Sequence, residues 1–474
     1  MAQIAGIQDF RGDGAPADIG TYQFPATVMI FKFTFSGVSY TVAMRSGVSS
    51  WVLLSQGVSG TDDVQMQAAF DYLVSLVWPG GSIYVKTGVY ILTNSVIVSA
   101  IGVDMYGFQF IGEENFKSMI YGPVNAPAFI VGSLGQVAYP VFRGFRFSGS
   151  NVGANPYILF TTNGVDSGAT EALVENNEFI GCNIAIQFNA DVVGMNYMMV
   201  RENWLIGNTA VNGGALIDVP SASGQVHSLW IYDNWFDCQA LDEHQKAISL
   251  GRVGGGPYKI DENEFFVQDN MVLHVNGGYS GTFNDNRIKL RATSTTSANS
   301  RIINLDGCNN ARMIINDNLV YRTDISAQAE YFIYMDDPIY SLTVEGNDLS
   351  YANFQQADVI EQFARNTFGR YVNNAGYNPK GVSALPFRNT PDVVTANYGN
   401  AAGPTNANTD YVVDSIPCYI SWSGGTAVDV TIKDAVGGNV ISNPGATGDF
   451  WLEPTWAIDF GDFTVAPTVL VAFK

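Results

Sequence analysis

The stretch that decides the fold is Ile231–Phe236, which reads IYDNWF. Its frame is an apolar residue, two variable residues, Asn, one variable residue, and a second apolar or aromatic residue. The chain contains eight such frames: VENNEF from Val174, VRENWL from Val200, IYDNWF, IDENEF from Ile260, FNDNRI from Phe283, INDNLV from Ile315, VEGNDL from Val344 and FARNTF from Phe363. The Asn positions are 177, 203, 234, 263, 286, 318, 347 and 366, so the steps are 19–32 residues. A repeat with this spacing predicts a solenoid.

The residues around each Asn indicate the kind of solenoid. Apolar and polar residues alternate there, whereas helical repeats require a 3.6-residue period. Between 19 and 32 residues accommodate three short strands with their turns. Parallel strands stacked coil on coil would place each apolar side chain over its equivalent and form one continuous core. The sequence therefore predicts an all-β, right-handed parallel β-helix, the handedness following from the resemblance described below.

The repeated Asn has a structural explanation. At a corner between two strands, its short amide tolerates unusual backbone angles and can bond the turn and its stacked neighbour. The acidic residues just before it are expected at solvated corners: Glu202, Asp233, Glu262, Asp285 and Asp317.

The composition supports an all-β protein and excludes several functions. The 474 residues include 49 glycines, 47% are hydrophobic and only 14% are charged, which favours a large core and many tight turns. The net charge of −21 opposes binding to nucleic acid or anionic lipid. The N-terminus MAQIAGIQDF lacks the pattern of a secretion signal, and no apolar run reaches about 18 residues. We expect no nucleic-acid partner and no membrane insertion.

Cysteine and histidine usage predicts neither a metal site nor a cofactor. The four cysteines lie far apart without metal-ligand spacing, and buried free thiols are expected: Cys182, Cys238, Cys308 and Cys418. His227, His244 and His274 also lack such spacing. A histidine-dependent mechanism therefore has little support in the sequence.

A helix is predicted just before the first coils. Asp62 and Gln65 form a possible capping box, and Pro79-Gly80-Gly81 would end the helix. Its apolar residues are spaced for one helical face: Val64, Ala68, Ala69, Leu73, Leu76 and Val77. Such a helix would cover the open end of the coil stack.

Three regions follow from these patterns. Residues 1–58 are expected to form an N-terminal attachment or leader region, and residues 59–385 the β-helix. Residues 386–474 comprise a Gly/Asn/Ala-rich linker and a small C-terminal antiparallel β domain, because apolar and polar residues alternate there around Gly-Gly turns.

The chain resembles phage tailspikes and depolymerases of the pectate-lyase-like β-helix superfamily. The resemblance covers roughly residues 59–385 and rests on the Asp62-Asp63 helix, GGSIYVKTGVYIL from Gly80, GFQFIGEENFKSMIYG from Gly107, and the Asn-centred coils. Lys86-Thr87 replaces the usual proline before Gly-x-Tyr. The resemblance implies a right-handed β-helix, commonly trimeric, that acts on polysaccharide.

The positions one and three residues after each Asn are expected to point outward, because side chains alternate along a strand. On the middle coils these positions include Trp204 and Trp235, which would stand about 4.8 Å apart on successive coils. Such a strip suits the faces of sugar rings, but a subunit interface explains it equally well.

Asp237 and Glu264 are the candidate catalytic pair. They lie diagonally on neighbouring coils, about 7–8 Å apart, a separation from which either a retaining or an inverting glycosidase could be built. Arg287 and Lys289 on the next coil could bind an acidic sugar. Tyr232 and Asp261 on the preceding strand complete the predicted substrate-binding set, with Trp204 and Trp235. The alternative is an ion cluster on the surface.

Other acidic residues compete for the catalytic role, namely Asp242-Glu243, Asp261 beside Tyr232, and Asp336-Asp337. Short motifs of the polygalacturonase family occur only in the reverse of that family's order, as Arg287-Ile288-Lys289, Asp336-Asp337 and Asn408-Thr409-Asp410, and Gly-His-Gly is missing. They therefore do not support a polygalacturonase site. No acidic group has calcium-ligand spacing.

The expected function is that of a homotrimeric phage tailspike that recognises and hydrolyses a bacterial surface polysaccharide, attached to a phage tail, baseplate or adaptor protein. The alternatives are a virion adhesin that binds glycan without cleaving it, and a polysaccharide lyase. The expected location is the virion tail, with action at the host cell surface.

Overall fold

The computed structural model describes residues 27–375, apart from short gaps, and strands between residues 411 and 473. The gaps within 27–375 are 48–49, 77–78, 114–115, 150–154, 163–167, 191–194, 208–213, 221–225, 239–244, 252–256, 269–270, 278–279, 292–300, 309–310, 324–328, 330, 336–338, 353–359, 363–367 and 373. The chain divides into two units, Met1–Leu205 and Ile206–Lys474. Each unit is described by itself.

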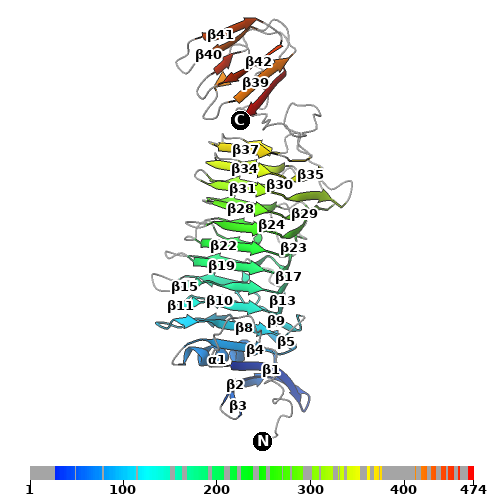
Figure 1. Ribbon diagram of the computed structural model, residues 1–474. Helices are drawn as coiled ribbons and strands as arrows, with labels where there is room; N and C mark the ends of the chain where they lie inside the picture. Colours follow the sequence, from blue (N-terminus) through cyan, green and yellow to red (C-terminus); the bar gives the residue numbers. More distant parts are fainter. Residues whose placement is uncertain are drawn as a thin grey trace. The chain divides into compact units, whose positions relative to one another are not determined.

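The first unit is a stack of coils that contribute one strand to each of three main sheets (Figure 1). Sheet A contains β3 (Trp51–Val58), β2 (Val38–Ser46), β1 (Thr27–Phe35), β4 (Gly81–Val85), β8 (Phe108–Gly112), β12 (Val141–Arg143), β16 (Leu173–Glu175) and β19 (Met195–Arg201). Sheet B contains β5 (Gly88–Ile91), β9 (Ser118–Tyr121), β13 (Phe145–Ser148) and β17 (Glu178–Cys182). Sheet C contains β6 (Val96–Val98), β10 (Phe129–Val131), β14 (Pro156–Thr161) and β18 (Ile184–Asn189), and a smaller sheet contains β7 (Met105–Tyr106), β11 (Gln136–Ala138) and β15 (Gly168–Thr170). The unit boundary falls within β20 (Trp204–Gly207).

The second unit repeats the same three-sheet coil. Sheet A contains β22 (Val226–Tyr232), β25 (Tyr258–Asp261), β28 (Ser280–Asn284), β31 (Arg312–Asn316), β34 (Ser341–Glu345) and β37 (Phe368–Val372). Sheet B contains β23 (Trp235–Asp237), β26 (Glu264–Val267), β29 (Arg287–Leu290), β32 (Leu319–Arg322) and β35 (Asp348–Tyr351). Sheet C contains β21 (Gly214–Val219), β24 (Gln245–Leu250), β27 (Met271–Asn276), β30 (Arg301–Asp306), β33 (Tyr331–Met335) and β36 (Ile360–Gln362). The described strand pairs within these sheets are parallel, and the predicted right-handed parallel solenoid is confirmed.

The last strands pair antiparallel. One group is β38 (Tyr411–Val412), β43 (Ala457–Asp459), β40 (Asp429–Lys433) and β41 (Asn439–Pro444), and the other is β42 (Thr447–Leu452), β39 (Cys418–Ser423) and β44 (Thr468–Phe473). The pairing has the direction that the sequence predicted. The division at residue 386 stays a prediction.

The N-terminal strands continue the first coil. β1 pairs in parallel with β4, and β2 and β3 extend the same sheet in antiparallel fashion. The helix α1 (Asp63–Val74) follows them and inserts Phe70 against the core rings of Phe108, Phe110 and Phe129, with ring centroids 4.7–6.5 Å apart. This contact is what a helix over the end of the core would make, but its capping role stays a prediction.

The predicted details of this helix were partly wrong. Val64 is 54% exposed, and the helix ends at Val74, before Pro79. The capping box is absent, because the Asp62 carboxylate does not bond the helix. It instead accepts hydrogen bonds from Lys32 Nζ at 2.8 Å, Thr41 Oγ1 at 2.5 Å and the Ile91 backbone at 2.6 Å. A buried carboxylate needs charged and polar partners, and β1, β2 and β5 supply them.

The Asn residues form hydrogen-bonded columns within each unit. In the first unit, Asn203 Oδ1 accepts bonds from Asn177 N at 3.0 Å and Asn177 Nδ2 at 3.1 Å. In the second unit the same bonds join successive members of the series 234, 263, 286, 318, 347 and 374. All these side chains are buried, and their mutual bonds satisfy them, as predicted from the sequence.

Two details of the column differ from the prediction. Asn366 lies outside the described residues, and Asn374 occupies the place after Asn347, in a frame where Tyr371 replaces the usual first apolar residue. The left-handed backbone angle falls on the residue before the Asn, not on the Asn itself: Asn176, Glu202, Asp233, Glu262, Asp285 and Asp317 have φ of 50–60°, and Gly346 has φ of 68°. The acidic members of this set are exposed, as expected.

This backbone angle gives a test of the corner. Replacing Glu262 by Val should lower the free energy of unfolding by about 1–2 kcal/mol, because a β-branched residue is strained at φ of 60°. Glu262→Gly should be close to neutral, because glycine accepts this angle. Denaturant titration of both variants would measure the difference. Equal losses would mean that side-chain contacts, rather than backbone strain, decide the position.

Candidate functional site

The candidate site lies on sheet B of the second unit, where the alternation of side chains sets its geometry. The residue two after each Asn is buried in the core: Phe236, Phe265, Ile288, Val320 and Leu349. The flanking residues therefore point away from the core. Strand pairing places Trp235, Glu264, Arg287 and Leu319 in one column, and Asp237, Phe266, Lys289 and Tyr321 in the next. Asp237 and Glu264 are thus diagonal neighbours, as predicted.

Both carboxylates are held by basic side chains of later coils. Asp237 Oδ1 lies 2.6 Å from Arg291 Nη1, and the Asp237 side chain is only 7% exposed. Glu264 Oε1 forms an ion pair with Lys289 Nζ. Both cations come from β29 or the residue after it, so the two ion pairs tie Asp237 and Glu264 to the same segment of chain. Arg287, in the same column as Glu264, is exposed.

An aromatic ring lies at the centre of these charges. The Phe266 ring centroid is 4.3 Å from Lys289 Nζ and 5.0 Å from Arg291 Cζ, and it lies 4.9 Å from the Trp235 ring centroid. Lys289 Nζ is also 5.7 Å from the Tyr321 ring centroid. Cations over ring faces are attracted by the negative face of the π-system. The result is a partly exposed surface of rings and paired charges, which we call the sheet-B surface: Trp235, Asp237, Glu264, Phe266, Arg287, Lys289, Arg291 and Tyr321.

Sequence reasoning identified five of these eight residues. Phe266 and Tyr321 lie at predicted outward positions but carry no charge, so nothing in the sequence pattern singled them out. Arg291 lies one residue beyond β29, and its contact with Asp237 spans 54 residues of chain. A prediction that considers only neighbouring coils misses Arg291, because its long side chain reaches across two coils to Asp237.

Tyr232 and Asp261 lie around the corner, at the end of sheet A. They are direct register partners, so the structure brings them together as predicted. Burial raises the pKa of Asp261, while hydrogen bonds from the Thr282 hydroxyl at 3.1 Å and the Asn284 backbone oppose the rise. Asp261 thus tends to keep its proton at a higher pH than an exposed carboxyl would.

The raised pKa predicts a pH-dependent stability. The folded state binds this proton more tightly than the unfolded state, so the resulting stabilisation is complete below the unfolded pKa of 3.8 and is lost as pH rises through the folded pKa. Asp261→Asn removes this titration. Between about pH 4 and pH 7, the melting temperature of the wild type should therefore fall relative to that of Asp261→Asn. A constant difference at every pH would contradict this explanation.

Trp204 belongs to the first unit, and it is 50% exposed with its ring centroid 6.2 Å from that of Phe116. The strip formed with Trp235 therefore stays a prediction. The competing acidic residues 242–243 and 336–337 lie outside the described residues. In the first unit, Arg143, Glu175 and Arg201 form a column of ion pairs near the corner.

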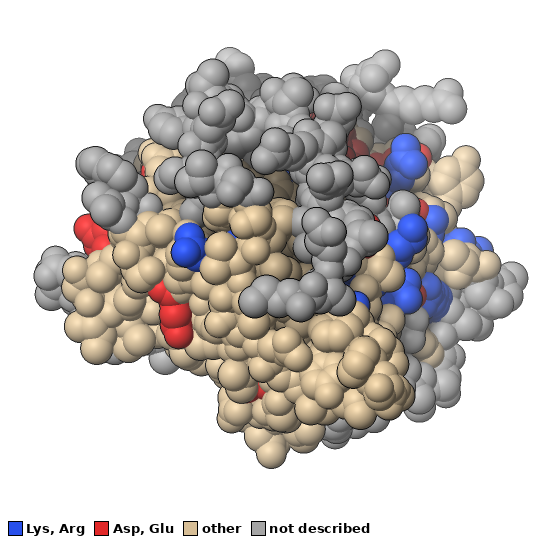
Figure 2. Space-filling model, turned by 90° about the horizontal axis from the view of Figure 1, so that it is seen from below, with Lys and Arg blue, Asp and Glu red and all other residues tan. Residues whose placement is uncertain are grey.

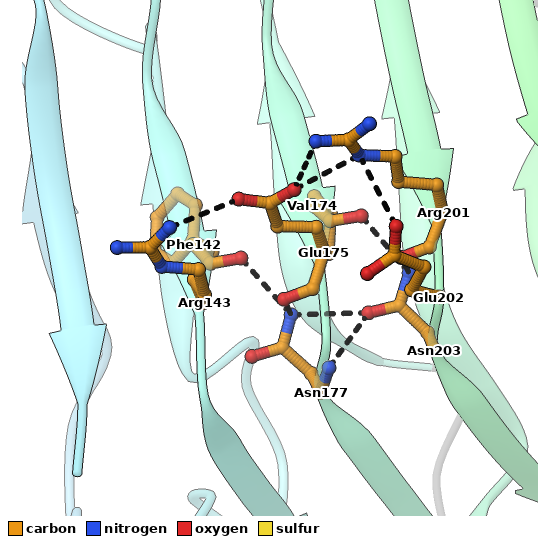
Figure 3. Close-up of polar contacts among 8 residues, drawn as sticks. All are labelled: Phe142, Arg143, Val174, Glu175, Asn177, Arg201, Glu202 and Asn203. Atoms are coloured by element: carbon orange, nitrogen blue, oxygen red, sulfur yellow. Dashed lines mark hydrogen bonds and ion pairs between the residues drawn. The ribbon is translucent and has the colours of Figure 1, made fainter. Parts of the chain in front are cut away.

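In that column, Glu175 of β16 lies between Arg143 of β12 and Arg201 of β19 (Figure 3). Its two oxygens lie 3.4 Å from Arg143 Nη1 and 2.7 Å from Arg201 Nη2, beside the bonded Asn177 and Asn203. Glu175 is buried and bonded from both neighbouring coils. We therefore interpret this ionic column as part of the framework.

No family model and no curated protein sequence matches the chain. Several solved structures are similar in fold. The A-module of the Azotobacter vinelandii mannuronan C-5 epimerase AlgE6 is 13% identical, with 67% of this chain and 96% of that chain covered and a TM-score of 0.32. PfbA, a surface adhesin of Streptococcus pneumoniae, is 13% identical over 72% and 96%, with a TM-score of 0.33. An Acinetobacter phage tailspike protein is 10% identical over 88% and 84%, with a TM-score of 0.36.

Both units repeat a coil of three parallel strands with a buried Asn column. The chain folds as a right-handed parallel β-helix. In the end-on view of Figure 2, most of the described surface of this β-helix is uncharged, and Lys and Arg side chains gather on one side.

Within the described part of the β-helix, no three His, Cys, Asp or Glu side chains are grouped to hold a metal ion. No described helix has the length and apolar character needed to span a membrane. Cys182, Cys238 and Cys308 are buried free thiols, as predicted, and the side chain of Cys418 lies outside the described set.

Proposed function

We propose that this chain is a phage tailspike that binds a bacterial surface polysaccharide through the sheet-B surface and hydrolyses it there. The observation that carries the proposal is the grouping of Trp235 and Phe266 with two carboxylates and three cations on neighbouring coils. Rings and charged hydrogen-bonding groups on one surface are the combination that sugar rings and their hydroxyls require.

The periodicity of the surface also suits a polymer. Parallel strands repeat about every 4.8 Å, so the outward columns offer regularly spaced groups along the solenoid. The exposed Arg287 adds a cation at the edge of this surface, where it can bind an acidic sugar or a hydroxyl.

Hydrolysis would use Asp237 and Glu264 in different roles. One protonates the oxygen of the leaving sugar, and the other activates a water molecule or attacks the sugar. Diagonal neighbours have Cα atoms about 7–8 Å apart, from which their side chains can reach either carboxylate spacing used by glycosidases. The ion pairs with Arg291 and Lys289 support this role by holding both groups in place.

A second candidate function is supported by the same ion pairs. Each carboxylate already has a cationic partner, and a surface of neutralised charges and rings binds glycan without needing to cleave it. The chain would then be a virion adhesin. A polysaccharide lyase would differ from both by leaving unsaturated sugar ends.

The test uses the full chain with capsule and O-antigen purified from candidate hosts. Released oligosaccharides with saturated ends would support hydrolysis, and ends absorbing in the ultraviolet would support a lyase. Binding without products, measured by calorimetry, would favour the adhesin. The proposal would be refuted if the chain neither bound nor cleaved any host glycan. Sedimentation would test the proposed trimer.

A further inference from the structure

The corner at which the chain enters sheet A of the first unit carries exposed tyrosines. Each coil there passes from the smaller sheet of β7, β11 and β15 into a strand of sheet A. Tyr106, Tyr139 and Tyr197 lie at this corner, and they are 54%, 50% and 57% exposed. Single exposed aromatic residues are common on protein surfaces, but three along one edge of the solenoid form a patch.

Backbone hydrogen bonds place these residues on successive coils. The N–H of Tyr139 donates to the carbonyl before Glu171 at 2.9 Å, and the N–H of Glu171 donates to the carbonyl before Tyr197 at 2.7 Å. Tyr139, Glu171 and Tyr197 therefore occupy one position on three successive coils. Tyr106 lies one coil earlier, because it pairs with the residue that precedes Tyr139. We call these four residues the tyrosine column.

The backbone of the column is strained at two of its tyrosines. Tyr139 has φ of 58° and Tyr197 has φ of 54°. On the coil of Tyr106 the same position is Gly107, with φ of 67°, and glycine suits this angle. A bulky residue with a left-handed angle costs free energy, and an exposed ring recovers little of it by burial. Folding therefore does not explain these rings, and strain at exposed groups is typical of residues that act on a ligand.

The spacing of the rings suits a sugar chain. Coils repeat about every 4.8 Å, so Tyr139 and Tyr197 stand two coils, or about 9.6 Å, apart. This distance is close to the two-sugar repeat of an extended, cellulose-like chain. A tyrosine offers a ring face for the apolar face of a sugar and a hydroxyl for its polar edge. Glu171 lies midway between the rings, where its carboxylate can accept hydrogen bonds from sugar hydroxyls.

The charge of the column favours an uncharged ligand. Glu171 is exposed and forms no ion pair with another described residue. Its carboxylate would repel an acidic sugar, and the net charge of −21 adds to this repulsion. Glutamate is also depleted at the centres of protein interfaces, so a neighbouring subunit fits the column less well than a neutral glycan.

We propose that the tyrosine column is a second carbohydrate-binding site, which holds an extended, uncharged stretch of polysaccharide without cleaving it. Sugar rings pack on Tyr139 and Tyr197, and the sugar between them donates hydroxyl hydrogen bonds to Glu171. Tyr106 extends the site by one coil. The inference rests on the proposed polysaccharide binding, but it requires neither the sheet-B surface nor its carboxylates.

The experiment measures the binding of cellohexaose, an extended and uncharged chain, to the full-length protein by calorimetry. Tyr197→Gly should weaken binding at least about fivefold, because one of two stacked rings is lost. Its midpoint of urea unfolding should not fall, because glycine accepts the backbone angle. Tyr197→Phe keeps the ring and should retain most of the affinity. Leu53→Ala, at a residue of β3 with a similar exposure of 54%, is the control and should bind normally.

Two further ligands test the geometry and the charge. Cellobiose is too short to reach both Tyr139 and Tyr197, so its binding should be weaker than that of cellohexaose and should fall less in Tyr197→Gly. Hexagalacturonate has the same number of sugars but is acidic, and Glu171 should make its binding weaker. Hexagalacturonate binding as tight as that of cellohexaose would contradict the preference for an uncharged chain.

Equal affinity of Tyr197→Gly and the wild type for cellohexaose, or no binding by the wild type, would overturn the inference. A changed sedimentation coefficient in Tyr197→Gly would also overturn it, because the ring would then lie in an interface between copies of the chain. If host polysaccharide were still bound and cleaved in these cases, the proposed function would stand. If cellohexaose bound at the tyrosine column but no host glycan were bound or cleaved, the proposed function would fail alone.

Discussion

Combining Asp237→Asn with Glu264→Gln is expected to reduce polysaccharide cleavage by at least about a hundredfold, while binding falls much less. Each substitution keeps the shape of the side chain but removes its ability to exchange a proton. General acid–base catalysis by a positioned group contributes about 10²–10⁴-fold to a rate. An amide can still accept bonds from Arg291 or Lys289, so the sheet-B surface should keep its form.

The assay measures new reducing ends released from the host polysaccharide that the wild type cleaves, with calorimetry for binding. Asp348→Asn is the matched control, because Asp348 lies in the same column as Glu264, beyond Arg287 and Leu319. It should cleave at the wild-type rate. Full activity in the double variant would exclude this pair and transfer the search for catalysis to other carboxyl groups.

Replacing Asn286 by Ala is expected to lower the free energy of unfolding by about 3 kcal/mol, since each buried polar group left unsatisfied costs about 1–3 kcal/mol. Asn286 Oδ1 accepts bonds from the backbone and side-chain nitrogens of Asn263 at 3.0 and 3.1 Å. Its Nδ2 donates to Ile260 O at 2.9 Å and Asn318 Oδ1 at 3.0 Å. The substitution therefore interrupts the column on both sides.

Denaturant titration of the full chain would measure this loss. Arg287→Ala is the control, because Arg287 is the next residue, is exposed and has no part in the column. It should change the stability by less than about 0.5 kcal/mol. Equal midpoints for Asn286→Ala and the wild type would mean that water replaces the amide, and that the column does not hold the coils together.

The sequence predicted the coil because a strict local rule repeats in it. An apolar residue, an Asn and a second apolar residue must coincide at every corner, and the buried Phe236, Phe265 and Ile288 obey this rule. The frame of the last described coil was missed because Tyr371 and Gly376 occupy its two apolar positions, although Asn374 keeps the hydrogen bonds. The end of a solenoid has fewer neighbours to satisfy, so its frame is free to vary.

The sequence predicted those contacts of the candidate site that join equivalent positions of neighbouring coils. Neighbours one coil apart, such as Trp235 and Glu264, come directly from the register. Contacts that cross two coils through a long side chain do not, and Arg291 reaches Asp237 in this way. Asp62 shows the same limit, because its partners on β1 and β2 are 30 and 21 residues away and outcompete a local helix cap.

The most direct test of the central claim is a crystal structure of Glu264→Gln, as the full chain, with an oligosaccharide of the host polysaccharide. The claim predicts a sugar ring against Trp235 or Phe266, with a glycosidic oxygen within hydrogen-bonding distance of residue 237 or 264. Sugar density confined to other surfaces, with the sheet-B surface bare, would contradict it.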